Sequence, residues 1–227
     1  MVHEVIRISS GSAAMDWLLE GGYEKGVITT IYGPAGAGKT NFCMMCLANN
    51  ADKKVIYIDS EGSFSVDRLK QLTEDYETIL KNVIILKPID FNEQKKVFEK
   101  LKSLINTQIS LLIVDSMAML YRLEIGKSKD AIRANRELGV QLASLIQIAR
   151  KFNIPVLLTN QVYSDLDEKD KYKLVGGDTL KYASKCLIEL QKKDYERKAV
   201  LKKHRSLPEG KELRFKIIDS GIEEIEE

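Results

Sequence analysis

The chain of 227 residues is 44% hydrophobic and 30% charged, the balance of a globular protein, and its length suits one α/β domain over residues 1–227. Its formal net charge of +2 is too small to indicate nucleic-acid binding by itself, so a DNA site must come from local clustering of cations. No apolar run approaches the roughly 18 residues of a membrane span, and the N-terminus lacks a secretory pattern, so we expect a cytoplasmic protein without membrane attachment.

Short, nearly continuous apolar segments recur along the chain and predict strands that are covered on both faces, as in a parallel sheet. In chain order they span residues 27–32, 55–59, 83–86, 111–115 and 155–159. Helical periodicity separates them, for example at Val97, Leu101, Leu104 and Ile105, and at Leu138, Leu142, Leu145 and Ala149. This alternation predicts a doubly wound α/β sheet with right-handed crossovers.

The pattern changes after residue 184. Residues 186–191, 199–203 and 213–218 follow one another as strands with short links, which predicts antiparallel strands at one edge of the sheet. We expect the acidic segment 222–227 to be a solvated tail.

A phosphate-binding loop follows the first of the predicted parallel strands and opens a predicted helix. The pattern G-x-x-x-x-G-K-[ST] is matched in full by Gly33, Pro34, Ala35, Gly36, Ala37, Gly38, Lys39 and Thr40. The glycines let successive backbone N–H groups turn toward an anion, and the helix N-terminus adds positive charge. Lys39 should reach the β- and γ-phosphates and Thr40 should bind Mg²⁺, which makes ATP and Mg²⁺ the expected cofactors.

Polar residues at the ends of other predicted strands supply the remaining parts of an ATPase. Asp115 ends an apolar run and is the candidate Mg²⁺ ligand, the alternative being an aspartate that caps a helix. Glu61 is the candidate base for the attacking water, with Asp59 as the competing acid. Gln161 follows a further strand, where an amide can hydrogen-bond the γ-phosphate.

The cysteines favour a structural role. Cys43 and Cys46 form a C-x-x-C, but no second Cys/His pair completes a zinc site and Cys186 stands alone. The pair falls in the helix expected after the phosphate loop, which favours burial in the core over redox chemistry.

Together these residues resemble the RecA/RadA recombinase superfamily. The resemblance covers nearly the whole chain, in the segments Gly11-Ser12, 18–22, 33–40, 59–64, Arg68-Leu69, 114–116, 120–122, 159–162, Gly176-Gly177 and 207–210. It implies a RecA-like core with a mostly parallel sheet flanked by helices. It further implies that Glu61 is the catalytic base, Gln161 the γ-phosphate sensor, and Arg68 a residue that packs on the adenine.

The sequence departs from a full strand-exchange recombinase. The core starts almost at Met1, so we expect no N-terminal helical DNA-binding domain and no linker strand. The second DNA-binding loop, between Val162 and Gly176, is short and mixes Asp165, Asp167, Glu168 and Asp170 with Lys169, Lys171 and Lys173. The ATP-capping Asp-x-Pro of the superfamily is replaced by Lys203-His204-Arg205, preceded by Lys202. The combination is similar to the archaeal RadB group and argues against filament assembly and strand exchange.

The basic segment is the prime DNA-binding candidate, through phosphate contacts of Lys202, Lys203, His204 and Arg205. Two alternatives stay open: a solvated strand end, or contact with a neighbouring subunit's γ-phosphate, as lysines make in bacterial RecA. Residues 122–136, with Lys127, Lys129 and Arg133, are a second candidate DNA contact.

The leading hypothesis is a DNA-binding accessory ATPase of homologous recombination and repair, with weak DNA-dependent turnover and association with the nucleoid. Its expected partners are DNA, with single strands favoured, and a partner recombinase or a second copy of the chain. The main alternative is a regulatory binding module that uses ATP as a switch without significant turnover. A helicase or circadian-clock ATPase of the same fold is a third hypothesis.

Overall fold

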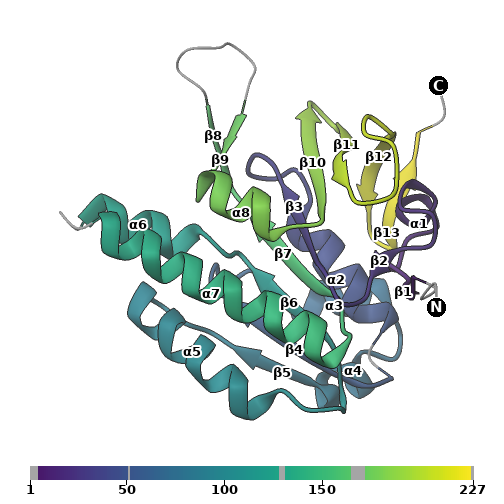
Figure 1. Ribbon diagram of the computed structural model, residues 1–227. Helices are drawn as coiled ribbons and strands as arrows, with labels where there is room; N and C mark the ends of the chain where they lie inside the picture. Colours follow the sequence, from purple (N-terminus) through teal and green to yellow (C-terminus); the bar gives the residue numbers. More distant parts are fainter. Residues whose placement is uncertain (1–4, 51, 128–130, 165–171, 226–227) are drawn as a thin grey trace.

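The sheet that organises the molecule has nine strands in the part of the chain that the structure describes. That structure is a computed structural model, and it describes residues 5–50, 52–127, 131–164 and 172–225 (Figure 1). In spatial order the strands are β13 (Gly221–Glu224), β12 (Glu212–Ile218), β11 (Glu196–His204), β10 (Cys186–Lys193), β3 (Ile28–Tyr32), β7 (Val156–Asn160), β6 (Ile109–Asp115), β4 (Lys54–Asp59) and β5 (Val83–Leu86).

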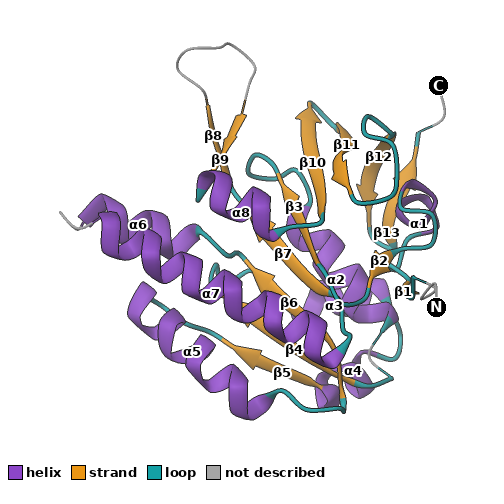
Figure 2. Cartoon of the chain, viewed as in Figure 1, coloured by secondary structure: helices purple, strands orange, loops and turns teal. Residues whose placement is uncertain are grey.

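Helices cover both faces of this sheet (Figure 2). One face carries α1 (Ala13–Leu18), α2 (Lys39–Asn49), α3 (Val66–Leu72) and α4 (Tyr76–Asn82). The other carries α5 (Phe91–Leu104), α6 (Met119–Lys127), α7 (Ala131–Phe152) and α8 (Gly177–Ala183). Two small antiparallel pairs lie outside the main sheet: β1 (Arg7–Ile8) with β2 (Tyr23–Glu24), and β8 (Val162–Ser164) with β9 (Tyr172–Leu174).

The side-chain alternation of the central strands explains why they are mostly apolar. In β4, Ile56 and Ile58 pack in the core beneath α5 and α7, whereas Val55 and Tyr57 pack in the core around α2. Because both faces are buried, most positions of a central strand are apolar, and the polar exceptions such as Thr29 and Thr30 of β3 are buried as well. The same alternation in β6 and β7 fixes their register in the sheet.

All five predicted parallel strands are confirmed, and the sheet is parallel from β10 through β3, β7, β6 and β4 to β5. The C-terminal edge needs one correction. β10 pairs parallel with β3, so the antiparallel edge consists of β11, β12 and β13 alone.

The expectation of a solvated C-terminal tail was wrong for residues 222–224. They belong to β13, in which Ile222 lies opposite Ile217 of β12 and packs against the core around α2. An edge strand has one free side, so charged residues such as Glu223 and Glu224 are tolerated there, and the strand lacks an apolar pattern in the sequence.

Candidate nucleotide-binding and catalytic site

The phosphate loop connects the carboxyl end of β3 with α2, and its glycines are required by what lies beside them. A Cβ on Gly33 would lie 2.3 Å from the carbonyl oxygen of Leu190 in β10. Gly38 caps α2 with φ = 104°, and its Cβ would lie 3.1 Å from Ile217 Cδ1 in β12. The C-terminal strands therefore approach the loop so closely that side chains at these positions would displace it.

Lys39 is the first residue of α2, and its side chain points back into this loop. Its Nζ donates to the carbonyl oxygens of Gly33 and Pro34, both at 2.9 Å, and the residue is buried. Burial lowers the pKa of the Lys39 ammonium, and the nearby carboxylates of Glu61 and Asp115 oppose that shift. A buried ammonium among carbonyl oxygens, next to a helix N-terminus, fits the phosphates of a nucleotide.

Asp115 and Thr40, the two predicted Mg²⁺ ligands, are brought together at the ends of β6 and α2. Thr40 Oγ1 donates to Ser63 Oγ at 3.4 Å, and Ser63 Oγ donates to Asp115 Oδ2 at 3.0 Å. One hydroxyl thus bridges the two side chains. Hydroxyl and carboxylate oxygens are the donors that Mg²⁺ prefers, so this pair fits the metal that accompanies a nucleotide.

The carboxylate of Asp115 is fully buried and is held by two further hydroxyls. Tyr57 OH donates to Oδ2 at 2.9 Å, and Thr159 Oγ1 donates to Oδ1. Burial raises the pKa of Tyr57, and the negative charge of Asp115 raises it further. The phenol therefore stays protonated and continues to donate to the carboxylate.

The two acids at the carboxyl end of β4, Asp59 in its last position and Glu61 two residues beyond it, have different environments. Asp59 Oδ1 accepts from the backbone N–H of Ser63 at 2.9 Å, and Oδ2 accepts from that of Phe64 at 3.2 Å. The buried Asp59 carboxylate thus closes the turn after the strand. Glu61 instead accepts through Oε1 from Gln161 Nε2 at 2.9 Å and from Ser116 Oγ at 2.5 Å. Of the two acids, Glu61 is the one placed among the other candidate site residues.

Gln161 connects this site with the β8–β9 hairpin. Its backbone carbonyl accepts from Val175 N at 3.2 Å, and the neighbouring Asn160 Nδ2 donates to Val175 O at 2.8 Å. These bonds lie at the base of the hairpin, directly before the first residue of β8 and directly after the last residue of β9. The predicted acidic and basic residues 165–171 of the second loop lie outside the described residues.

Arg68, assigned to the adenine by resemblance, holds the turn between β12 and β13 against α2. Its guanidinium donates to Asn41 Oδ1 at 2.7 Å and to the carbonyl oxygens of Ile218 and Asp219, both at 2.8 Å. Burial lowers its pKa, and Asp219 opposes the shift. The geometry gives Arg68 an anchoring role, and a contact with adenine stays a prediction.

The four residues of the basic segment do not form one surface. Lys202 forms an ion pair with Glu189 at 3.6 Å, and Lys203 Nζ donates to the carbonyl oxygens of Lys181 and Ser184 at the end of α8. His204 and Arg205 turn toward the buried carboxylate of Glu24.

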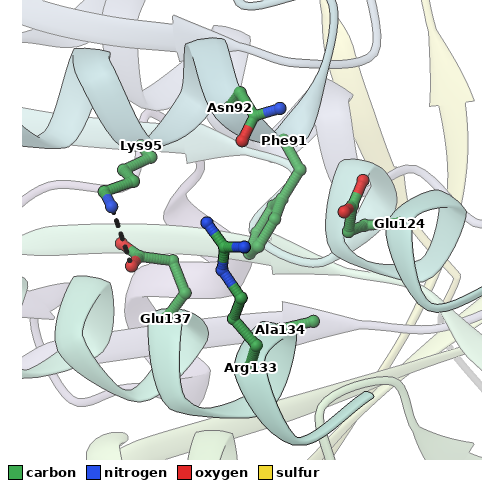
Figure 3. A pocket seen from close by; sticks show the side chains of 7 residues that line it. All are labelled: Phe91, Asn92, Lys95, Glu124, Arg133, Ala134 and Glu137. Carbon is green, nitrogen blue, oxygen red and sulfur yellow. Dashed lines mark ion pairs between the residues drawn. The ribbon is translucent and has the colours of Figure 1, made fainter. Parts of the chain in front are cut away.

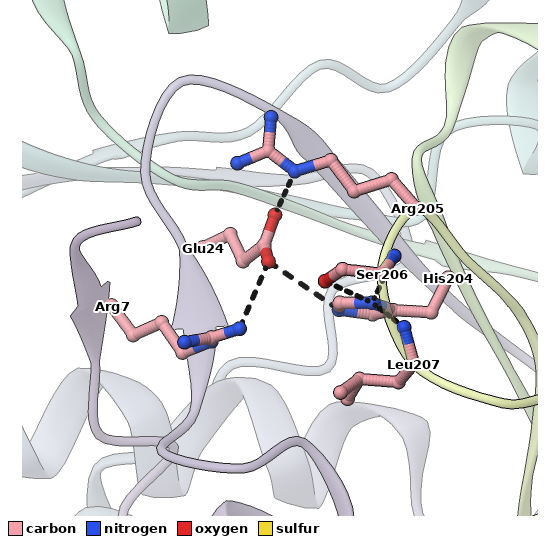
Figure 4. A network of polar contacts seen from close by, with 6 residues as sticks. All are labelled: Arg7, Glu24, His204, Arg205, Ser206 and Leu207. Atoms are coloured by element: carbon pink, nitrogen blue, oxygen red, sulfur yellow. Dashed lines mark hydrogen bonds and ion pairs between the residues drawn. The ribbon is translucent and has the colours of Figure 1, made fainter. Parts of the chain in front are cut away.

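Three basic residues surround the carboxylate of Glu24, and Figure 4 shows the side chains of Arg7, His204 and Arg205 converging on it. Arg205 Nε lies 2.5 Å, Arg7 Nη2 3.2 Å and His204 Nε2 3.7 Å from its carboxylate oxygens. Burial lowers the pKa of His204, and Glu24 opposes that shift. His204 therefore has a buried, structural environment, whereas the Arg205 side chain is 41% exposed.

The second candidate DNA region, residues 122–136, is largely helical. α6 extends to Lys127 and α7 starts at Ala131, and Lys129 lies outside the described residues. Arg133 points into a cavity of about 190 Å³ that Glu124 and Glu137 also line (Figure 3). Lys95 forms an ion pair with Glu137 there at 3.6 Å, so the cavity carries mixed charge.

The cysteines confirm the structural interpretation. Cys43, Cys46 and Cys186 are free and buried. Burial raises the pKa of each thiol, to about 12 for Cys186. In the described parts of the chain, no group of three or more His, Cys, Asp or Glu side chains could hold a metal ion. Within the same described parts, no helix has the length and apolar character to cross a membrane.

Sequence reasoning missed several hydroxyl residues that hold the site. Ser63 bridges Thr40 and Asp115, and Ser60 Oγ donates to Ser116 O at 2.6 Å while accepting from Ser116 N at 2.9 Å. Both serines lie in the segment 59–64 after a strand, the signal that selected Glu61. Their roles depend on β6, which is distant in the sequence, so the local pattern could not specify them.

Comparison with known proteins gives consistent relatives. Residues 1–225 match the family model described as Rad51. The chain is 42% identical over 221 residues to the DNA repair and recombination protein RadB of Methanobrevibacter smithii, with 93% of each chain covered. It is 44% identical over 213 residues to the protein of the same name from Methanococcus maripaludis, covering 92% of this chain and 97% of that one.

A solved structure agrees with these relatives. A crystal structure of the RadB recombinase superposes with a TM-score of 0.82 at 39% sequence identity, covering 96% of this chain and 100% of the other.

Proposed function

The chain belongs to the Rad51 family, and from this premise we propose that it is an ATP- and DNA-binding protein of homologous recombination and DNA repair. Its relatives at about 40% identity carry the name DNA repair and recombination protein. The observation that carries the proposal is the hydroxyl bridge from Thr40 through Ser63 to Asp115, beside the buried Lys39. We assign the chain a weak, DNA-dependent ATPase with an accessory role rather than strand exchange.

Each residue of the site then has a stated task. Lys39 would exchange its two loop carbonyls for phosphate oxygens, and Thr40 and Asp115 would hold Mg²⁺, which neutralises phosphate charge when bound. Glu61 would take the proton of the attacking water. Gln161 would couple the presence of the γ-phosphate to the conformation of the β8–β9 hairpin, because its backbone is bonded to the base of that hairpin. Arg68 would pack on the adenine.

For DNA we propose contacts through Lys202 and Arg205, whose side chains are 49% and 41% exposed. Lys203 and His204 are engaged with α8 and with Glu24, so they would support the strand rather than grip phosphates. DNA binding would associate the protein with the nucleoid.

The test is fluorescence anisotropy with single-stranded DNA over a salt series. The variant Lys202→Ala/Arg205→Ala should lose affinity and about 1.4 units of the logarithmic salt slope, since each phosphate contact on single strands contributes about 0.7. The matched control, Lys96→Ala/Lys100→Ala on exposed positions of α5, removes the same charge and should bind as wild type. Equal binding by both variants would redirect the DNA site to residues 122–136.

The Glu61–Gln161 hydrogen bond favours a second candidate function, an ATP-switched module that regulates a partner recombinase without useful turnover. The carboxylate of the candidate base is occupied by the amide of the residue that starts the β8–β9 hairpin. DNA-stimulated turnover above about one per minute, still far below the roughly 1–1000 per second of typical enzymes, would favour the ATPase. No turnover, with ATP-dependent binding of a partner recombinase or of a second copy, would favour the switch.

A further inference from the structure

The hairpin formed by β10 and β11 extends past the end of its neighbour β3 and reaches the phosphate loop. β3 ends at Tyr32, which pairs with Glu189, but β10 continues to Lys193. Residues 190–193 therefore run alongside the loop into which β3 turns. Beside Leu190, which contacts Gly33, the ammonium of Lys192 lies 3.3 Å from the position that a Cβ would take on Gly36.

Arg197 reaches the same glycine from the other strand of the hairpin. It is the cross-strand partner of Lys192, and its Nε donates to the carbonyl oxygen of Gly36 at 3.3 Å. Two cations thus converge on Gly36 from adjacent strands. The next pair along the hairpin, Lys193 with Glu196, combines opposite charges and projects to the other face of the sheet.

Lys192 and Arg197 place two positive charges directly opposite each other in the hairpin. Like charges directly opposite each other in an antiparallel pair are destabilising. Among the described residues, no carboxylate forms an ion pair with Lys192 or Arg197, although Lys198 and Arg214 nearby do have such partners. An anion held by the phosphate loop would relieve the repulsion, because both cations already lie against that loop.

We propose that Lys192 supplies a second ammonium to the terminal phosphates of the nucleotide from within the same chain, and that Arg197 positions it by holding Gly36. The proposal rests on the nucleotide binding proposed above. A cation supplied in cis to the transferring phosphoryl group is a known device of P-loop proteins. The ligand class is a nucleoside triphosphate, which carries more charge at this end of the loop than a diphosphate.

The test compares equilibrium binding of a fluorescent non-hydrolysable ATP analogue with that of fluorescent ADP, both with Mg²⁺. Lys192→Ala should weaken triphosphate binding about tenfold and diphosphate binding less than about threefold, since hydrogen bonds to charged groups are among the stronger ones. Lys192→Arg should keep the preference for triphosphate. The matched control Lys193→Ala removes the same charge from the adjacent exposed position on the other face and should bind both nucleotides as wild type does.

The positioning residue has its own readout. Arg197→Ala should reduce the preference for triphosphate over diphosphate by a few fold, and Arg197→Lys should restore it, because a lysine can also donate to the Gly36 carbonyl.

Three outcomes would overturn the proposal. Equal triphosphate affinity of Lys192→Ala and Lys193→Ala would show that the ammonium makes no contact. Equal weakening of both nucleotides by Lys192→Ala would show an effect on the loop as a whole. If wild type bound neither nucleotide, nucleotide binding itself would be refuted and the role of Lys192 with it, whereas either of the first two outcomes leaves nucleotide binding intact.

Discussion

Gln161 Nε2 donates to Glu61 Oε1 at 2.9 Å, which joins two residues that are one hundred positions apart in the sequence. Glu61 follows β4 and Gln161 follows β7, and β6 lies between these strands in the sheet. The bond spans the carboxyl edge next to the phosphate loop and ends at the β8–β9 hairpin. A change in the hydrogen-bond partners of Glu61 would therefore alter the position of Gln161 at the base of that hairpin.

The first prediction concerns Glu61 as the base. Glu61→Gln removes the proton acceptor but keeps the side-chain volume, so DNA-stimulated ATP turnover should fall at least about 100-fold. Affinity for the nucleotide should change less than about threefold, because Lys39 and the loop are untouched. A steady-state phosphate-release assay checks the first value and fluorescence titration the second. Glu99→Gln, at an exposed position of α5, is the control for charge loss, and hydrolysis at the wild-type rate by Glu61→Gln would exclude the assignment.

The second prediction concerns Asp115 and Mg²⁺. Asp115→Asn removes the negative charge and places an amide among the hydroxyls of Tyr57, Ser63 and Thr159. Added Mg²⁺ should then no longer strengthen nucleotide binding, as measured by titration with and without the metal. Tyr57→Phe is the matched control: it loses one buried hydrogen bond, worth about 1 kcal/mol of stability, and should keep the Mg²⁺ response. A normal Mg²⁺ response in Asp115→Asn would contradict the metal assignment.

The positions of the candidate site residues were predictable where a polar residue lies at or just after the end of an apolar strand. Apolar runs that end in a polar residue place Asp115, Glu61 and Gln161 at one edge, because the strands are parallel and their carboxyl ends meet there. The structure brings these residues together with Lys39 and Thr40 as that rule requires. The different environments of Asp59 and Glu61 needed the structure, since the two acids are only two positions apart in the sequence. Asp59 accepts from backbone N–H groups, whereas Glu61 accepts from the side chains of Ser116 and Gln161.

Contacts between distant segments were not predictable from local pattern. Arg205 pairs with Glu24 because the chain at the end of β11 lies next to β2, and Lys192 lies over Gly36 because β10 pairs with β3. No spacing in the sequence encodes these neighbours. The four basic residues at 202–205 likewise form one cluster in the sequence. In space its side chains diverge, because successive residues of a strand point to opposite faces.

The third prediction tests the close approach of β10 to the phosphate loop. Gly33→Ala places a Cβ 2.3 Å from the backbone of Leu190, so the loop must move and nucleotide binding should be lost. The free energy of unfolding should drop by more than about 2 kcal/mol, as for other overpacked sites. Gly210→Ala is the control, because its φ is 89° but its Cβ would meet open space. It should cost only the roughly 1–2 kcal/mol of a left-handed residue and leave binding intact; equal effects of the two substitutions in urea unfolding would contradict the packing argument.

The fourth prediction concerns His204 and acid stability. His204 Nδ1 accepts from the backbone N–H groups of Ser206 and Leu207 at 3.2 and 3.1 Å, so the neutral ring carries its proton on Nε2, toward Glu24. Protonation of Nδ1 would break both bonds, in agreement with burial as the main cause of the lowered pKa; Arg7 and Arg205 lower it further, and Glu24 opposes them. Since the folded pKa lies below the unfolded value of about 6.5, the stabilisation is complete above that value and is lost as the pH falls through the folded pKa. The melting temperature of wild type should therefore decrease more between pH 7.5 and 5.5 than that of His204→Gln, which cannot titrate there.

The other histidine of the chain, His3, is present in both proteins and cancels in the comparison. Parallel melting curves for the two proteins across this range would show that His204 is not held neutral by the fold.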